Sequence, residues 1–351
     1  MKYPELLKFD DIAARLHEFD TLIDVRSPSE YAQDHLPGAI NCPVLDDAER
    51  ILVGTTYKQV GAFEAKKMGA AIVARNVSKH LDTLWQGKPR EWRPLVYCWR
   101  GGNRSGAMAH ILAKIGWPVV QLNGGYKEYR HYVAAALEQP PALDFRVICG
   151  TTGSGKSRLL QTLDMVGAQV LDLEQLAAHR GSVLGRIPSH PQPSQKMFES
   201  VVWDRLRRFD PSRPVFVESE SRKVGELRVP AALIERMRTS PCIALQLPRA
   251  HRVQLLMDDY AHFTQDPRAL NEQLSYLTAL HGKDRIAAWQ ALANAGRMPE
   301  LVDALLAEHY DPAYLRSIHR NFPQLAQGQV LDLPGITEQD FHTAALALHT
   351  A

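Results

Sequence analysis

Residues 150–157 read Gly-Thr-Thr-Gly-Ser-Gly-Lys-Ser and satisfy the pattern GxxxxGK[ST] in full. An apolar run at 145–149 precedes the motif and a helical pattern follows it, which is the context in which this pattern binds phosphate. The glycines let the backbone wrap a diphosphate, Lys156 neutralises its charge, and Ser157 is placed to hold Mg²⁺. We therefore predict a phosphate loop made of Gly150, Thr151, Thr152, Gly153, Ser154, Gly155, Lys156 and Ser157.

A second candidate anion site surrounds Cys98, which lies between a predicted strand and a predicted helix. Successive N–H groups at a helix N-terminus attract anions and favour a cysteine thiolate. Isolated cysteines are often inert core residues, but a core cysteine does not require the two glycines and two arginines found here. We predict Cys98 and Arg104 as catalytic residues, in a loop completed by Trp99, Arg100, Gly101, Gly102, Asn103 and Ser105.

Short apolar strands alternate with helical patterns along the chain, which is typical of parallel α/β sheets. Paired prolines at 140 and 141 mark the best linker, because they cannot continue a helix. We expect a first α/β domain at 1–138, a linker at 139–144, and a phosphate-loop α/β domain at 145–351 with a helix-rich C-terminal part. Strands are predicted at 21–26, 94–97, 145–149, 168–171, 214–217 and 242–245, and helices at 105–115, 285–295 and 298–308, with Gly296 and Pro312 as breaks.

Composition excludes several classes of protein. The 351 residues suit two domains of roughly 150 residues each. The four cysteines lie far apart with no CxxC pair, so we expect free thiols rather than a disulfide framework or a zinc site. The N-terminus lacks a signal-peptide profile and no apolar run is long enough to cross a bilayer, which favours a cytoplasmic protein without membrane association.

Charged side chains follow several other predicted strands, at the edge where open α/β sheets bind ligands. Glu218 is a candidate second metal ligand beside Ser157, although a buried strand-end acid is the competing interpretation. A polyanion would be held by clustered arginines, but a solvated helix face explains such clusters equally well. The candidates are Arg180, Arg186, Arg205, Arg207, Arg208, Arg222, Arg249 and Arg252.

The first 135 residues resemble the rhodanese family. Residues 24–31 read Asp-Val-Arg-Ser-Pro-Ser-Glu-Tyr and residues 35–39 read His-Leu-Pro-Gly-Ala, which is similar to the early signature of that family. Cys98 occupies the position of its persulfide-carrying cysteine. The Cys-x5-Arg spacing is one residue longer than in typical sulfurtransferases and resembles related cell-cycle phosphatases and arsenate reductases, so spacing alone leaves open whether Cys98 carries a chalcogen or attacks a phosphate.

Nearly the whole chain resembles the bacterial tRNA 2-selenouridine synthase family, in which a rhodanese domain is joined to a phosphate-loop domain. The resemblance extends in order through segments 54–59, 63–69, 123–127, 179–182 and 309–312. It implies replacement of sulfur by selenium in 2-thiouridine at the tRNA wobble position, with selenophosphate as donor. It further implies geranylation of that sulfur from geranyl diphosphate, and an enzyme that supplies selenophosphate. With tRNA as the polyanion, the arginines named above are the candidate tRNA contacts.

Two other classes of protein remain alternatives at this stage. One is a persulfide sulfurtransferase or Cys-dependent phosphatase fused to an ATP-dependent kinase-like domain. The other is a non-catalytic RNA-binding regulator, which the complete cysteine and phosphate loops disfavour. Within the family interpretation, our hypothesis places the diphosphate at Lys156 and the selenium chemistry at Cys98.

Overall fold

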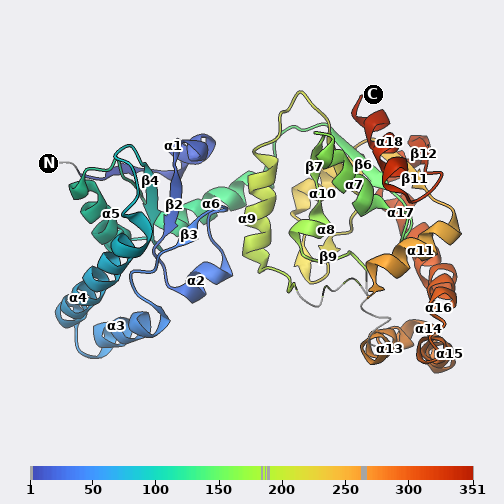
Figure 1. Cartoon of the computed structure of the whole chain (residues 1–351), viewed down its shortest axis with the longest axis horizontal. Helices are drawn as coiled ribbons and strands as arrows, with labels where there is room; N and C mark the ends of the chain where they lie inside the picture. Colours follow the sequence, from blue (N-terminus) through green and yellow to red (C-terminus); the bar gives the residue numbers. More distant parts are fainter. Residues whose placement is uncertain (1–2, 183–184, 186, 188–189, 262–266, 351) are drawn as a thin grey trace. The chain divides into compact units, whose positions relative to one another are not determined.

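A computed structural model describes residues 3–182, 185, 187, 190–261 and 267–350 (Figure 1). The chain forms two compact units. The first unit comprises Met1–Gln139 and Pro193–Arg207, and the second comprises Pro140–Gln192 and Arg208–Ala351. Among the described residues, no helix is long and apolar enough to cross a membrane.

The first unit contains a five-stranded sheet in the order β1-β5-β4-β2-β3, and all of its strand pairs are parallel. β4 lies at its centre with every residue buried, as its continuous apolar run predicts. β2 ends at Asp24, two residues earlier than expected, because the backbone N–H of Arg26 turns to donate to the Asp24 carboxylate. The strands are β1 Glu5–Leu7, β2 Thr21–Asp24, β3 Ile40–Asn41, β4 Pro94–Tyr97 and β5 Val120–Leu122.

Helices of the first unit include a hairpin, α3 and α4, inserted between β3 and β4 (Figure 1). The start of α3 is fixed by Asp46, whose carboxylate accepts the backbone N–H of Glu49 at 2.7 Å. α5 begins two residues before the predicted helix at 105–115, because Gly102 at φ +76° turns the chain into it. The helices are α1 Phe9–Ile12, α2 Pro28–Gln33, α3 Asp47–Gln59, α4 Ala62–His80, α5 Asn103–Ile115 and α6 Gly125–Glu138.

Residues 193–207 differ from the expected domain plan. The sequence assigns them to the second domain, yet helix α9, Gln195–Leu206, packs against α6 in the first unit (Figure 1). The apolar pattern of α9 is satisfied there by side chains that lie far away in sequence. The linker is therefore not the only point at which the chain passes between the two units.

Trp203 is the main apolar anchor of α9. It is 4% exposed, and its ring centroid lies 5.8 Å from those of Phe9 and Tyr129 and 6.0 Å from that of Tyr132. Arg207 covers the outer face of the indole, 5.0 Å from the ring centroid. Aromatic clusters of this kind contribute both buried area and favourable edge-to-face geometry.

The second unit contains another five-stranded parallel sheet, in the order β12-β11-β6-β8-β7. The chain runs from β6 toward one edge and from β11 toward the other, so the loops after these neighbouring strands diverge and open a crevice. The sequence prediction missed the edge strand β12 within the helix-rich C-terminal part. The strands are β6 Phe145–Cys149, β7 Gln169–Leu171, β8 Val215–Glu218, β11 Cys242–Gln246 and β12 Gln329–Asp332, with a separate antiparallel pair, β9 Lys223–Val224 and β10 Leu227–Arg228.

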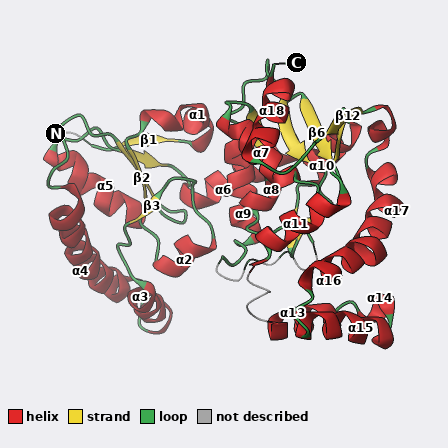
Figure 2. Cartoon of the chain, turned by 45° about the vertical axis from the view of Figure 1, so that its right-hand side comes forward, coloured by secondary structure: helices red, strands yellow, loops and turns green. Residues whose placement is uncertain are grey.

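Helices cover this sheet, and a helical subdomain follows it (Figure 2). Gly296 ends a helix as expected, with φ +69°. Pro312 does not end the helical run: it lies in the first turn of α17, directly after a π-helical turn, Leu306–Tyr310, that joins α16 to α17. The helices are α7 Lys156–Met165, α8 Leu173–Leu176, α10 Ala231–Thr239, α11 Arg249–Asp259, α13 Pro267–Ser275, α14 Thr278–His281, α15 Lys283–Asn294, α16 Met298–Leu305, α17 Asp311–Asn321 and α18 Glu338–His349.

Trp203→Ala should destabilise the first unit by about 3–5 kcal/mol, because it removes the ring that closes the aromatic cluster. The four cysteines are all free and buried, so thiol labelling in urea reports unfolding. Cys42, which is 0% exposed in the first unit, should become reactive at lower urea in the variant than in wild type. Met165→Ala, at a side chain 77% exposed in the second unit, is the control. An unchanged labelling profile of Cys42 would show that α9 is dispensable to the first unit.

Candidate functional site

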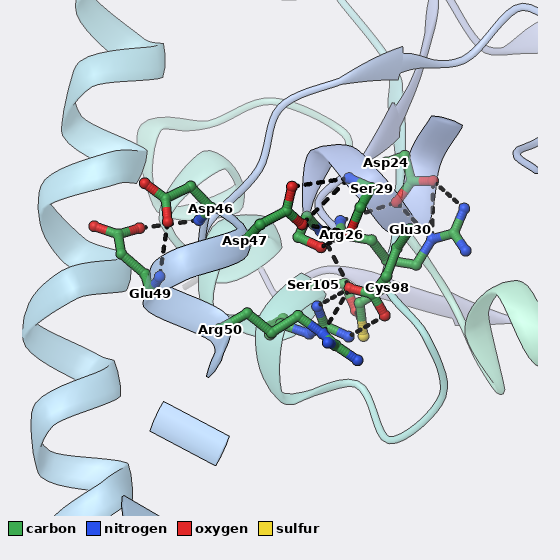
Figure 3. Close-up of polar contacts among 12 residues, drawn as sticks. Asp24, Arg26, Ser29, Glu30, Asp46, Asp47, Glu49, Arg50, Cys98 and Ser105 are labelled. Atoms are coloured by element: carbon green, nitrogen blue, oxygen red, sulfur yellow. Dashed lines mark hydrogen bonds and ion pairs between the residues drawn. The ribbon is translucent and has the colours of Figure 1, made fainter. Parts of the chain in front are cut away.

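Cys98 lies at the carboxyl end of β4 and is 3% exposed. Its Sγ accepts a hydrogen bond from Ser105 Oγ at 3.3 Å (Figure 3). Gln121 Nε2 donates to Ser105 Oγ and to the Gly102 carbonyl, both at 3.1 Å. Side chains from β5 and α5 thus orient the thiol at the start of the loop. The role of Gln121 was not predicted, because no local motif marks it.

The N-terminus of α6 supports the backbone of the cysteine loop. Tyr126 N donates to the Cys98 carbonyl at 2.8 Å, and Lys127 N donates to the Trp99 carbonyl at 3.0 Å. Gly125 permits this approach: it has φ +60°, and a Cβ there would lie 2.4 Å from the Cys98 carbonyl oxygen. Any larger residue at position 125 would displace the loop.

A buried ion pair lies beneath the loop. Arg26 is 1% exposed, and its Nη2 donates to Asp24 Oδ2 at 2.6 Å (Figure 3). The guanidinium carbon lies 4.0 Å from the ring centroid of Tyr126, whose hydroxyl donates to Asp34 at 2.8 Å. Ser200 of α9 donates to the other oxygen of Asp34, also at 2.8 Å. The residues that carry the cysteine loop are therefore fixed by charge as well as by packing.

Glu30 binds the arginine that the sequence predicts as catalytic. Arg104 Nη1 lies 2.8 Å from Glu30 Oε2, and Arg50 of α3 pairs with the same oxygen at 3.1 Å. Burial alone would raise the pKa of Glu30, but the hydrogen bond and charge of Arg104 outweigh burial and hold that pKa below its ordinary value. The structure places Arg104 at the rim of the loop, one-fifth exposed, with Arg100 and Trp99 beside it more exposed.

An open cleft separates the cysteine loop from α3. Its free space is about 1400 Å³, including the part open to solvent. Exposed apolar side chains of α3 line it together with Arg50 and Lys58. The lining thus combines apolar surface with positively charged side chains. Its lining includes Cys98 and residues 99–104, together with Leu45, Ile51, Val53 and Tyr57.

The phosphate loop follows β6 and leads into α7, as predicted. Lys156 Nζ donates to the carbonyls of Gly150 at 2.7 Å and Thr151 at 3.3 Å, so its ammonium lies inside the curl of the loop. Gly153 has φ +75°, and a Cβ there would lie 2.9 Å from Leu256 of α11. The loop thus rests closely on α11.

Acidic side chains border the loop differently from the prediction. Ser157 Oγ donates to Glu174 Oε2 at 2.9 Å, so the acid beside Ser157 is Glu174 and not Glu218. Glu218 accepts from the Glu174 backbone N–H, and burial together with neighbouring carboxylates raises its pKa well above the ordinary value. Among the described residues, no group of three or more His, Cys, Asp or Glu side chains has the geometry to hold a metal ion.

Glu220 completes this acidic cluster. Burial, followed by the charge of Glu174, raises the pKa of Glu220 to about 8, while the charge of Lys156 acts in the opposite direction. Glu220 is therefore mostly protonated at neutral pH. Its ionisation would add a negative charge beside the phosphate loop.

Most of the arginines predicted to bind a polyanion contact other groups of the protein. Arg252 is 6% exposed, donates to the Thr152 carbonyl and pairs with Asp311, so its role is to hold the phosphate loop. Arg249 pairs with Asp303 at 2.5 Å, and Arg207 pairs with Asp204 at 2.6 Å. Arg180 donates to the Asp259 carbonyl and stacks on Tyr260. Arg205 is half-buried, and Arg208 and Arg222 are exposed. Arg186 lies outside the described residues.

Glu220→Gln should flatten the pH dependence of anion binding at the phosphate loop. Because the folded-state pKa is raised, wild-type Glu220 is neutral below pH ~8 and charged above it, so wild-type affinity for pyrophosphate should fall relative to the variant between pH 7 and 9, by roughly 3–10-fold. Calorimetric titrations of both proteins measure this ratio. The exposed Glu226→Gln variant should follow wild type. A constant ratio across the range would remove Glu220 from the electrostatics of the loop.

Comparison with known proteins accounts for both loops. Residues 8–132 match the rhodanese-like domain, and residues 143–279 match the tRNA 2-selenouridine synthase AAA domain. The two parts of the expected α/β fold class are thereby confirmed.

Whole-chain similarity agrees with the domain matches. The tRNA 2-selenouridine synthase of Nitrosomonas europaea is 38% identical over 265 residues, which cover 74% of this chain and 68% of that protein. The synthase of a Sulfurovum species is 31% identical over 347 residues, covering 90% and 94%. That of Hydrogenovibrio crunogenus is 33% identical over 321 residues, covering 84% and 88%. This chain belongs to the tRNA 2-selenouridine synthase family.

Proposed function

We propose that this enzyme replaces sulfur by selenium in 2-thiouridine at the wobble position of tRNA, with selenophosphate as donor and geranyl diphosphate as a second co-substrate. Family membership supports the reaction class. We assign the two sites from one difference between the loops: the cysteine loop contains a nucleophile, and the phosphate loop does not. Cys98 opens to a wide cleft, whereas the phosphate loop offers a lysine and backbone N–H groups.

The phosphate loop serves the alkylation step. The thiocarbonyl sulfur bonds to the first carbon of the geranyl chain, the carbon–oxygen bond breaks, and diphosphate leaves with the electron pair. N3 of the uridine loses its proton to solvent, which leaves the alkylated base neutral. Lys156 and the N-terminus of α7 stabilise this leaving anion. Mg²⁺ that accompanies a diphosphate would meet the Ser157 hydroxyl and the Glu174 carboxylate, and would supply further charge neutralisation there.

The cysteine loop serves the selenium step. Loop N–H groups and the exposed Arg100 bind the phosphate of selenophosphate, and Ser105 and Gln121 orient the thiol of Cys98 as the soft nucleophile of the site. Across the reaction, the Se–P bond breaks and the phosphoryl group passes to water as inorganic phosphate, while selenium, still at the selenide oxidation level, becomes bonded to C2 of the uridine and geranyl thiol leaves. S-geranylation assists because a thiol is a better leaving group than the sulfur of a thiocarbonyl.

The tRNA would approach the cleft beside Cys98, where Arg50, Lys58 and Arg100 present positive charge to a backbone. Among the arginines predicted from the sequence, Arg180, Arg205, Arg208 and Arg222 stay candidates for contacts farther along the RNA. We further propose that the enzyme works in the cytoplasm, where an enzyme that makes selenophosphate supplies its donor.

Cys98→Ser should abolish 2-selenouridine while changing tRNA affinity less than about twofold, because a hydroxyl has similar size but is far less nucleophilic. Mass spectrometry of tRNA nucleosides from cells that express the variant measures the product. Cys42→Ala is the matched control, because burial and then Asp24 raise the pKa of that thiol to about 12. Wild-type levels of 2-selenouridine in Cys98→Ser would exclude Cys98 from the mechanism.

Lys156→Ala should reduce geranyl transfer at least ~100-fold and leave tRNA binding nearly unchanged, since one lysine neutralises much of a diphosphate but little of a long polyanion. Geranylated nucleoside is quantified at saturating and subsaturating geranyl diphosphate. Lys283→Ala, an exposed lysine of the second unit, should behave as wild type. Geranylation at the wild-type rate would mean that the loop binds a different ligand.

A further inference from the structure

A pocket in the second unit opens beside the phosphate loop. It lies among α11, α13 and α16, and α11 and α16 pack against each other (Figure 1). Its free space, including the part open to solvent, is about 550 Å³. Thr152 of the phosphate loop forms part of the wall. The apolar lining includes Leu256, Met257, Leu270, Leu301, Leu305 and Tyr310.

The pocket and the phosphate loop share structural support. Arg252 of α11 donates to the Thr152 carbonyl at 2.8 and 3.0 Å, and Leu256 lies one turn further along the same face of the helix. Gly153 packs against Leu256 so closely that no side chain fits between them. A ligand whose diphosphate occupies the loop therefore has the mouth of this pocket next to it.

The chemistry of the lining indicates which group attached to the diphosphate the pocket can bind. Leucine and methionine side chains dominate, and the hydroxyls of Ser182 and Tyr260 are 3.4 Å apart and satisfy each other. A nucleoside placed here would bury its sugar and base polar groups without partners, at a large cost in affinity. A hydrocarbon chain loses nothing, and each methylene buried strengthens binding by about fourfold.

The depth of the pocket is graded. Leu256 and Met257 are half-buried near the loop, whereas Leu301, Leu270 and Leu305 are 1, 3 and 5% exposed. The three deeply buried leucines therefore form the inner end. A chain that enters past Thr152 meets them last, so they limit the length it reaches.

We propose that the phosphate loop and this pocket form a single site for an isoprenoid diphosphate, with the hydrocarbon chain among α11, α13 and α16 and the inner leucines setting chain length. This inference rests on the proposed function, in which the loop binds geranyl diphosphate. The hydrocarbon chain would lie in the apolar pocket, which disfavours a nucleotide, and the inner leucines would determine specificity.

Calorimetric titration of the full-length protein tests the site without requiring turnover. The ligands are inorganic pyrophosphate, dimethylallyl diphosphate, geranyl diphosphate, farnesyl diphosphate and ADP. Affinity should rise at least tenfold at each step from pyrophosphate through the five-carbon to the ten-carbon chain, whereas ADP should bind no better than pyrophosphate. Lys156→Ala should weaken pyrophosphate and geranyl diphosphate alike.

Leu301→Trp fills the inner end and should reduce affinity for geranyl diphosphate at least tenfold while leaving that for pyrophosphate unchanged. Leu315→Trp, at a position 59% exposed on α17, is the matched control and should bind every ligand as wild type does. Leu301→Ala enlarges the inner end instead, and should raise the affinity for farnesyl relative to geranyl diphosphate. This second variant keeps the proposal testable should the tryptophan prevent folding.

The outcomes separate the inference from the function on which it rests. Equal affinity for pyrophosphate and geranyl diphosphate, or ADP binding tighter than either, would overturn the pocket assignment and leave the loop as an anion site. Unaltered chain-length preference in both Leu301 variants would do the same. Failure of every diphosphate to bind would instead refute the proposed role of the loop.

Discussion

Both candidate sites depend on one backbone constraint: the chain must leave a central parallel strand and begin a helix within a few residues, around a space large enough for an anion. At each site a glycine in the left-handed region begins the helix, Gly102 before α5 and Gly155 before α7. Because the N–H groups of the first helical turn have no partners within the helix, they face that space. The chemistry then differs only through the side chains added around a common frame.

The two frames are stabilised by opposite electrostatic arrangements. Under the cysteine loop, the buried guanidinium of Arg26 is matched by Asp24 and lies against aromatic rings, so positive charge is fixed in the core. Beside the phosphate loop, Glu218 and Glu220 are buried close to other acids, and their raised pKa values keep them protonated. The first arrangement fixes its geometry through a direct ion pair, whereas the second responds to pH and to the charge of whatever binds.

The sequence identified what is local and missed what is distant. Both loops, the strands that precede them and the α/β class followed from spacing and glycine placement. The partner of Arg104 did not, because Glu30 lies on α2 and only the tertiary fold brings the two together. Arg252 illustrates the same limit, because an arginine after a strand looks identical in sequence whether or not it faces solvent. Here it donates to the Thr152 carbonyl and pairs with Asp311. Glu218 lies close to the phosphate loop as expected, but the acid that contacts Ser157 is Glu174, whose backbone N–H donates to Glu218.

Residues 193–207 belong to the first unit although the chain on both sides of them belongs to the second, so neither unit is a single continuous segment. A fragment cut at the proline linker would lack Trp203 and Ser200, leaving the rings of Phe9, Tyr129 and Tyr132 uncovered and one oxygen of Asp34 without its donor. The complementary fragment would carry α9 with Phe198, Val202 and Trp203 no longer covered by the first unit. Neither half is a transferable building block, so recombination between relatives at the linker would succeed only where the incoming α9 fits the α6 it meets.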